Sequence, residues 1–145
     1  GEEFEMRTKA VISQYDRCSP DALNDDQKVN GALTIGENIG DLGGLPIAWK
    51  AWNKALADEG VASPSEAEVI DGLTGPERFF TSWARIWRGK QRDDYAVQLL
   101  AIDPHSPAEF RCNGVLANFD EFADYYDVSP GDALWITPED RVKIW

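Results

Sequence analysis

Apolar side chains recur at helical spacing along most of the chain, and the clearest run extends from Leu33 to Leu56. Its apolar positions repeat about every 3.6 residues, which predicts one long helix; they are Ile35, Ile39, Leu42, Leu45, Ala48, Trp49 and Trp52. Thr34 and Glu37 have the spacing of a capping box, so we expect Thr34 to begin this helix. Glycines and a proline inside a helix weaken it, and this run contains Gly36, Gly40, Gly43, Gly44 and Pro46.

Shorter helices are predicted on both sides of this run. Residues 1–15 are expected to form a helix before a polar loop over residues 20–31. The acidic stretch over residues 59–75 reads as a second loop, with a short helix around Glu66 to Ile70. Pro76 then occupies a first helical position, and the helix it opens carries a dense aromatic stripe, typical of a core, before ending near Gly89.

The last third of the chain follows the same pattern. Asp93 or Asp94 is expected to cap a further helix over residues 95–102. Ser106 and Pro107 have the pattern of an N-cap followed by proline at the first helical position. Two more short elements are predicted over residues 119–126 and after Pro138. Few segments alternate with the period of two that a strand requires, so the predicted fold class is mainly α.

The length and charge of the chain limit the number of domains and the classes of binding partner. A chain of 145 residues corresponds as a prior to one domain. Its 14 basic and 26 acidic residues give a net charge of −12, which repels phosphate backbones and anionic membrane surfaces. We therefore expect no nucleic-acid partner. No apolar run approaches the ~20 residues that a membrane span requires, and no signal peptide is visible, so localisation is unknown.

Metal-ligating residue types are scarce. The chain has one histidine and no Cys-x-x-Cys pair, whereas catalytic zinc sites usually take three protein ligands and often two histidines. This chain alone therefore cannot supply a two-histidine zinc site. Cys18 and Cys112 are too few for a disulfide scaffold, and their redox state is open.

Glu37 and Asp41 are four residues apart in the long helix, which places both carboxylates on one face. One interpretation is a solvated acidic edge, since Glu and Asp are mostly exposed. The other is metal ligation by one carboxylate, with the second orienting a neighbouring ligand. The spacing alone leaves both open.

His105 lies between Pro104 and Ser106 at the entrance of a predicted helix, and Arg111 follows six residues later. A histidine and an arginine together can bind a substrate carbonyl or the oxyanion that forms from it. Taken singly, His105 is better explained as a loop histidine without a role, and Arg111 as the partner of an ion pair.

The segment over residues 30–45 contains Glu37-Asn38-Ile39-Gly40-Asp41 and closely resembles the Glu-Asn-x-x-Asp block of the neprilysin-type zinc metallopeptidases. A second block agrees in order and spacing with the family's C-terminal region, and consists of Phe79-Phe80, Trp83, Trp87 to Arg92, Tyr95-Ala96, His105-Ser106-Pro107 and Phe110-Arg111. The closing Val142-Lys143-Ile144-Trp145 is similar to the family's terminal tryptophan segment. The resemblance covers about residues 6–145.

This resemblance implies a role for each matching position. Glu37 would be the third zinc ligand, and Asp41 would hold one of the two zinc-binding histidines in place. His105 would stabilise the tetrahedral transition state, and Arg111 would bind a backbone carbonyl of a peptide substrate. Asn38 matches the motif without an assigned chemistry. The implied fold is the helical C-terminal part of a thermolysin-like (gluzincin) catalytic domain.

The chain also departs from the family pattern. The His-Glu-x-x-His helix that supplies two zinc ligands and the general base in the family is absent from this sequence. Because the family places it upstream, and because Gly1 is not a methionine, we expect it to precede residue 1. Gly40 replaces a usual alanine, and we expect Gly40 and Gly43 to make room for that helix. The cysteine that many animal members carry before the terminal tryptophan is missing, which favours a bacterial-like member.

Residues 1–145 are therefore expected to form the C-terminal part of the catalytic domain of a zinc endopeptidase or oligopeptidase that cleaves short peptides. The fragment alone is predicted to be inactive and to bind zinc weakly or not at all. The partners of the parent enzyme would be the peptide substrate and the missing N-terminal half. Self-association through an exposed face around Leu42 is also expected. The alternative is a self-standing, non-catalytic helical module that binds peptides or a protein partner.

Overall fold

The computed structural model describes all 145 residues and contains helices without a β-strand. Six α-helices are joined by loops: α1 (Glu2–Tyr15), α2 (Gly31–Asp58), α3 (Gly75–Ile86), α4 (Asp93–Ile102), α5 (Ala108–Leu116) and α6 (Asp120–Tyr125). Two short 3-10 turns, Pro64–Glu66 and Pro138–Asp140, complete the list. The prediction of a mainly α fold is confirmed. None of the helices combines the length and apolarity needed to cross a membrane.

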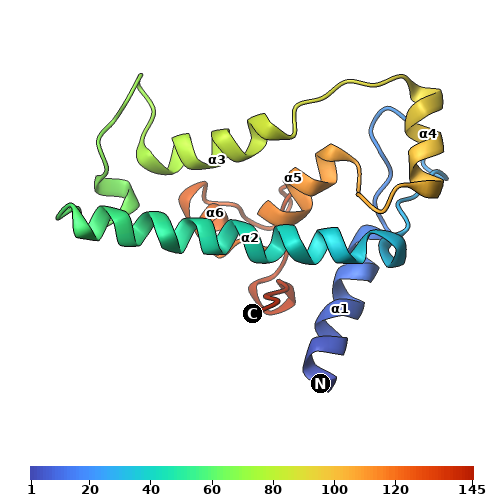
Figure 1. Cartoon of the computed structure of the whole chain (residues 1–145), viewed down its shortest axis with the longest axis horizontal. Helices are drawn as coiled ribbons and strands as arrows, with labels where there is room; N and C mark the ends of the chain where they lie inside the picture. The colour runs from blue at the N-terminus through green and yellow to red at the C-terminus, as the bar shows by residue number, and fades with distance from the viewer.

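Helix α2 is the long spine of the molecule (Figure 1). It begins one turn earlier than predicted, because the side chain of Asn30 accepts a hydrogen bond from the backbone N–H of Leu33 at 2.9 Å. The predicted cap, Thr34, lies inside the helix and donates to the carbonyl of Asn30 at 3.1 Å. The helix continues through its glycines and through Pro46. Burial of Leu42 and Leu45 on its inner face stabilises a segment whose intrinsic helix propensity is poor.

Other helix starts also differ from the predicted ones. Helix α3 begins at Gly75, one residue before Pro76, which was predicted at a first helical position. Thr74 caps this helix, and its side chain and that of Glu77 form a reciprocal capping box. Arg92 precedes α4, so Asp93 and Asp94 lie in the first turn instead of capping it. The short helix predicted around residues 66–70 is wrong: a 3-10 turn ends at Glu66, and residues 70–73 form a turn closed by an isolated bridge.

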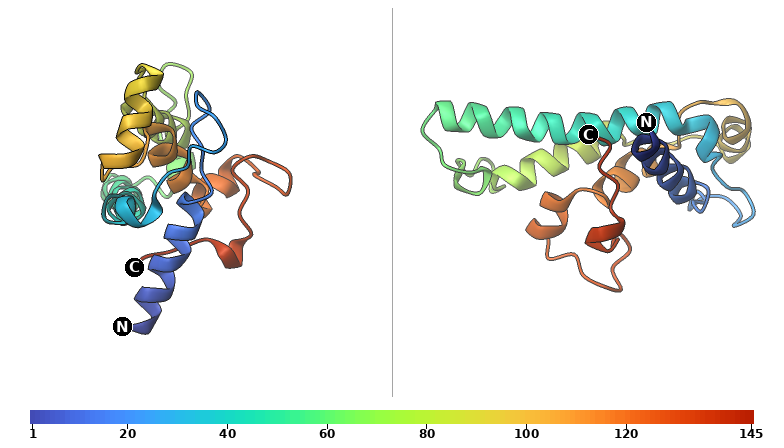
Figure 2. Two further views of the ribbon diagram at one scale, coloured as in Figure 1. Left: turned by 90° about the vertical axis from the view of Figure 1, so that its right-hand side faces the viewer. Right: turned by 90° about the horizontal axis from the view of Figure 1, so that it is seen from below.

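The core lies where α1, α2, α3, α5 and the C-terminal segment meet (Figure 2). Its eleven buried members are Val11, Tyr15, Val29, Leu42, Leu45, Phe80, Cys112, Val115, Leu116, Phe119 and Ile144. The aromatic stripe of α3 packs here as predicted, since Phe80 stacks on Trp49 with ring centroids 5.4 Å apart. Apolar burial of this kind is the main stabilising term for a single domain of this size.

The glycines of α2 have different surroundings. A Cβ atom on Gly43 would lie 2.7 Å from Nε1 of Trp145, so this glycine makes room for the last residue of the chain. The prediction that Gly43 leaves space for a metal-binding helix is therefore wrong. Gly40 has open space beside it. Leu42, named as the centre of an exposed face, is itself buried in the core.

Candidate functional site

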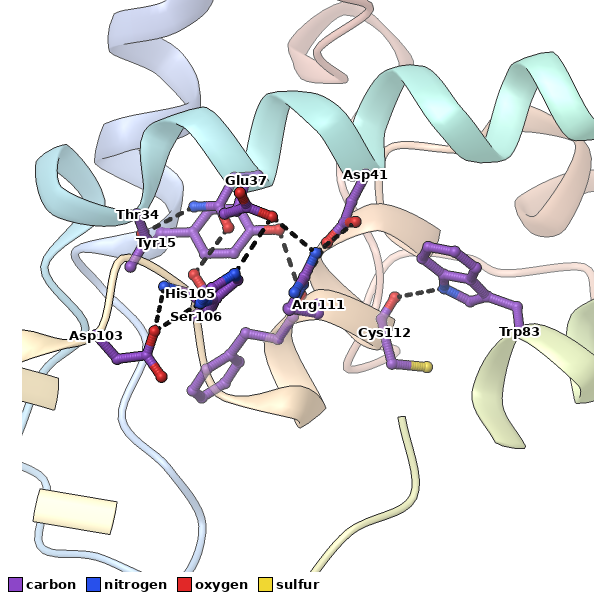
Figure 3. Close-up of polar contacts among 12 residues, drawn as sticks. Tyr15, Thr34, Glu37, Asp41, Trp83, Asp103, His105, Ser106, Arg111 and Cys112 are labelled. Atoms are coloured by element: carbon purple, nitrogen blue, oxygen red, sulfur yellow. Dashed lines mark hydrogen bonds and ion pairs between the residues drawn. The ribbon is translucent and has the colours of Figure 1, made fainter. Parts of the chain in front are cut away.

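The four residues singled out in the sequence come together at one place (Figure 3). Helix α2 carries Glu37 and Asp41 on one face, as their spacing predicted. Arg111 comes from the first turn of α5, and His105 comes from the turn that joins α4 to α5. The loop and α5 thus bring two cationic or polar side chains to the two carboxylates of α2.

Arg111 binds both carboxylates. Its Nε donates to Oδ2 of Asp41 at 2.7 Å, and its Nη2 donates to Oδ1 of Asp41 at 2.9 Å and to Oε2 of Glu37 at 3.3 Å. The hydrogen bond to Asp41 is the main reason that the pKa of Arg111 lies above its ordinary value. A bidentate pair of this kind fixes the orientation of the guanidinium plane.

The guanidinium of Arg111 is also held from one side. Its central carbon lies 4.4 Å from the ring centroid of Trp87, a cation–π geometry. The Nη1 atom of Arg111 makes no hydrogen bond within the chain, while Nε and Nη2 are occupied. Arg111 therefore has donors that remain free for a ligand.

His105 is oriented by Asp103, a residue that the sequence analysis did not identify. Oδ1 of Asp103 accepts a hydrogen bond from the backbone N–H of His105 at 2.9 Å and lies 2.6 Å from Nδ1 of its ring. These bonds hold the pKa of Asp103 below its ordinary value, so its carboxylate is ionised at neutral pH. An ionised carboxylate only accepts hydrogen bonds, so Nδ1 of His105 is the donor in this contact. The other ring nitrogen, Nε2, faces Oε2 of Glu37 at 3.6 Å.

A buried polar chain lies behind these residues. Ser106 donates from Oγ to Oδ1 of Asn38 at 2.8 Å, and Nδ2 of Asn38 donates to Oγ1 of Thr34 at 3.0 Å. The prediction that Ser106 caps α5 is wrong, because Pro107 precedes the helix and the Ser106 hydroxyl points to α2 instead.

Tyr15 of α1 packs beneath the site. Its hydroxyl donates to the carbonyl of Phe110 at 3.3 Å. Burial, together with the charge of Asp41, raises the pKa of Tyr15 well above its ordinary value. Tyr15 therefore stays a neutral phenol and supports α5 without adding a charge to the site.

The carboxylates of the site are not grouped as a complete metal centre. No cluster of three or more His, Cys, Asp or Glu side chains in the structure could hold a metal ion. Both oxygens of Asp41 accept from Arg111, and Asp103 is paired with His105. Glu37, whose side chain is 46% exposed, is the carboxylate of this group that is most open to a ligand.

Comparison with known proteins places these residues in a family. The sequence model of peptidase family M13 matches residues 1–142. Human membrane metallo-endopeptidase-like 1 is 36% identical over 99% of this chain, which spans 18% of that protein. The neutral endopeptidase of Lactococcus lactis subsp. cremoris is 34% identical over 99% of this chain, which spans 20% of that protein.

Solved structures agree with this assignment. The inhibitor complex of the Mycobacterium tuberculosis zinc metalloprotease ZMP1 superposes with a TM-score of 0.91 at 52% identity, covering 99% of this chain and 22% of that one. PEPO from Lactobacillus rhamnosis superposes with a TM-score of 0.75 at 30% identity, covering 99% and 20% of the two chains. The helical fold is thus that of the corresponding part of these proteins, and the chain belongs to peptidase family M13.

Proposed function

We propose that this chain supplies the C-terminal part of the active site of a zinc-dependent endopeptidase that hydrolyses bonds within short peptides. One observation carries the proposal: His105 and Arg111, from two other segments of the chain, both face the carboxylate of Glu37 on α2. Membership of peptidase family M13 supports the reaction class. The chain spans about a fifth of its relatives, so the activity is proposed for the full-length protein.

Glu37 is the residue that we assign as a zinc ligand. Its carboxylate is half-exposed, and carboxylate oxygen is an accepted zinc donor. The remaining ligands would come from a His-Glu-x-x-His helix outside this chain. Zinc in such a site supplies a Lewis acid that polarises the scissile carbonyl and activates water.

Asp41 would orient one of the zinc-binding histidines. Both of its oxygens accept from Arg111, yet an ionised carboxylate has about four lone-pair sites. Asp41 can therefore keep Arg111 and accept a further N–H from an imidazole. Its side chain is only 12% exposed, so the charge acts in partly desolvated surroundings.

His105 and Arg111 would stabilise the negative charge that develops on the carbonyl oxygen of the substrate. Because the carboxylate of Asp103 binds Nδ1, the other ring nitrogen, Nε2, faces the site and would be the donor to the substrate oxygen. Arg111 keeps its Nη1 hydrogens for a substrate carbonyl. Donors that are fixed before the reaction stabilise developing charge without reorganisation.

The 145-residue chain on its own should not hydrolyse peptides. It carries one proposed zinc ligand and lacks the general base that the family places in the His-Glu-x-x-His helix. We expect it to retain no stoichiometric zinc after dialysis. One equivalent of zinc held with an affinity tighter than micromolar would contradict this part of the proposal.

The proposal is tested in the full-length protein by measuring zinc content and cleavage of a short peptide in parallel. Glu37→Ala should lose both zinc and activity. His105→Ala and Arg111→Ala should keep zinc, while kcat/KM falls by roughly 100-fold to 1,000-fold, as for loss of one oxyanion donor. Glu121→Ala, an exposed carboxylate in α6, is the matched control and should change neither quantity. Full activity with the Glu37→Ala variant would overturn the assignment.

A further inference from the structure

Asn38 is a fully buried polar residue behind the site. It lies on α2 directly after Glu37 and one turn before Asp41, and its side chain is 0% exposed. Burying a side-chain amide lowers the stability of the fold unless its donors and its acceptor form hydrogen bonds. Asn38 meets this demand through Ser106 and Thr34, at 2.8 and 3.0 Å.

Ser106, the partner across the site, is also buried and is the residue next to His105. The hydrogen bond from Oγ of Ser106 to Oδ1 of Asn38 therefore connects two segments that are 68 residues apart in the sequence. It ties the turn that carries His105 to the helix that carries Glu37 (Figure 3).

The other contacts of His105 do not hold its turn against α2. Asp103 belongs to the same turn, so it sets the rotation of the imidazole within the turn but does not place the turn against α2. The direct contact between His105 and Glu37 is 3.6 Å long and joins two side chains that are each nearly half-exposed. Exposed contacts of this kind hold geometry weakly. Between residues 103–107 and α2, the Ser106–Asn38 bond is the buried one.

We propose that Asn38 is a positioning residue, which acts through Ser106 to hold His105 at a fixed place beside Glu37. The catalytic consequence rests on the function proposed above, whereas the placement of His105 stands on this chain's own geometry. Thr34 completes the arrangement, because it accepts from Nδ2 of Asn38 and so fixes which end of the amide faces Ser106. This gives Asn38, a motif residue without an assigned chemistry, a defined task.

The single histidine of the chain provides a direct test. Because His105 is the only histidine, the ¹H NMR spectrum of the 145-residue chain should contain one histidine Cε1–H resonance, which would belong to His105. Asn38→Ala and Ser106→Ala should each shift or broaden this resonance at a fixed pH. The double variant should show no more change than either single one, because both substitutions break the same bond.

Asn118→Ala is the matched control. Asn118 is another buried asparagine, and its side chain bonds Gln14, the carbonyl of Gly114 and the backbone N–H of Val142 away from the site. This variant should destabilise the fold to urea while leaving the His105 resonance in place. If Asn38→Ala does not fold, Ser106→Ala decides, because it removes only one hydroxyl.

Kinetics of the full-length protein provide the second readout. Asn38→Ala and Ser106→Ala should lower kcat by up to about 100-fold, with a smaller change in KM, since misplacing a group by 1 Å has an effect of that order. Asn118→Ala should leave kcat unchanged. An unmoved His105 resonance in folded Ser106→Ala, or equal shifts in all three single variants, would overturn the proposal. If the full-length protein cleaves no peptide, the proposed function fails, but the NMR comparison still decides the role of Asn38.

Discussion

At the scale of single residues, Arg111 and Asp41 form a bidentate ion pair in the site. Two hydrogen bonds of 2.7 and 2.9 Å join side chains that are 16% and 12% exposed. We expect a double-mutant cycle with Arg111→Ala and Asp41→Ala to give a coupling free energy of roughly 1–3 kcal/mol in urea unfolding. A lysine cannot reproduce the planar fork, so Arg111→Lys should recover only a minor part of that coupling.

A surface pair within the same chain provides the comparison for this cycle. Lys54 and Asp58 form an exposed ion pair at 3.1 Å on α2. The same cycle on this pair should give about 0.5 kcal/mol or less, as is usual for exposed pairs spaced by one helical turn. Equal coupling energies for the two pairs would show that partial burial adds nothing to the Arg111–Asp41 contact.

The two cysteines differ in their surroundings, and this predicts a difference in reactivity. Cys112 is buried and Cys18 is half-buried, and both are free thiols. Burial raises the pKa of both thiols, which lowers the reactive thiolate fraction at neutral pH. We expect an alkylating reagent to label Cys18 before Cys112 in the native chain, and to label both at the same rate in urea. Mass spectrometry of tryptic peptides over time measures the order, and faster native labelling of Cys112 would contradict it.

The residues of the site were predictable to different degrees. Glu37 and Asp41 stand out because a helix with a spacing of four residues places them on one face. Asp103 was missed, although its position two residues before His105 is a short-range signal for a carboxylate that binds a histidine turn. Trp87 was assigned to the core, and nothing in a linear pattern indicates that a core aromatic also contacts Arg111.

At the scale of elements, the glycines of α2 give a matched pair. A Cβ atom on Gly44 would have no neighbouring atom within 4 Å, whereas a Cβ atom on Gly43 would lie 2.7 Å from the indole nitrogen of Trp145. Gly44→Ala should therefore stabilise the chain by about 1 kcal/mol, the difference in helix propensity. Gly43→Ala should gain less or lose stability, because Trp145 must move. Urea midpoints compare the two, and an equal gain at both positions would contradict the close approach of Trp145.

The start of α3 depends on an ionised carboxylate. Oε2 of Glu77 accepts from the backbone N–H of Thr74 at 2.7 Å, and this bond lowers the pKa of Glu77. A lowered folded-state pKa gives stability that is present above the ordinary glutamate pKa of about 4.3 and is lost as the pH falls through the lower folded value. Wild type should therefore be more stable than Glu77→Gln near pH 7, and this difference should vanish in acid. A difference that does not depend on pH would contradict it.

The presence of the α-helices could be predicted from the sequence pattern, but the residues at which they begin could not. Thr34 and Ser106 both have capping side chains at suitable places, yet each is buried and bonds within the site region instead. Asn30 caps α2 in place of Thr34, and α5 begins after Pro107 without a side-chain cap. The choice between neighbouring capping residues depends on which of them the tertiary fold buries, and a local pattern does not contain that information.

At the scale of the whole molecule, the two ends of the chain close the core together. Nη1 of Arg7 donates to the carbonyl of Ile144 at 3.1 Å, and Phe4 stacks on Trp145 with ring centroids 6.1 Å apart. These contacts join α1 to residues more than 130 positions away. Periodicity along the sequence indicates which faces are apolar, but it does not indicate that the last four residues lie against the first helix.

This closure predicts losses of stability of very different size for substitutions at the last two residues. Ile144 is 3% exposed and belongs to the core, so Ile144→Ala should lower the free energy of unfolding by about 2–5 kcal/mol. Trp145 is 80% exposed, and Trp145→Ala should lower it by less than about 1 kcal/mol. Urea unfolding followed by circular dichroism measures both. A large loss of stability from Trp145→Ala with little from Ile144→Ala would show that the core is closed in another way.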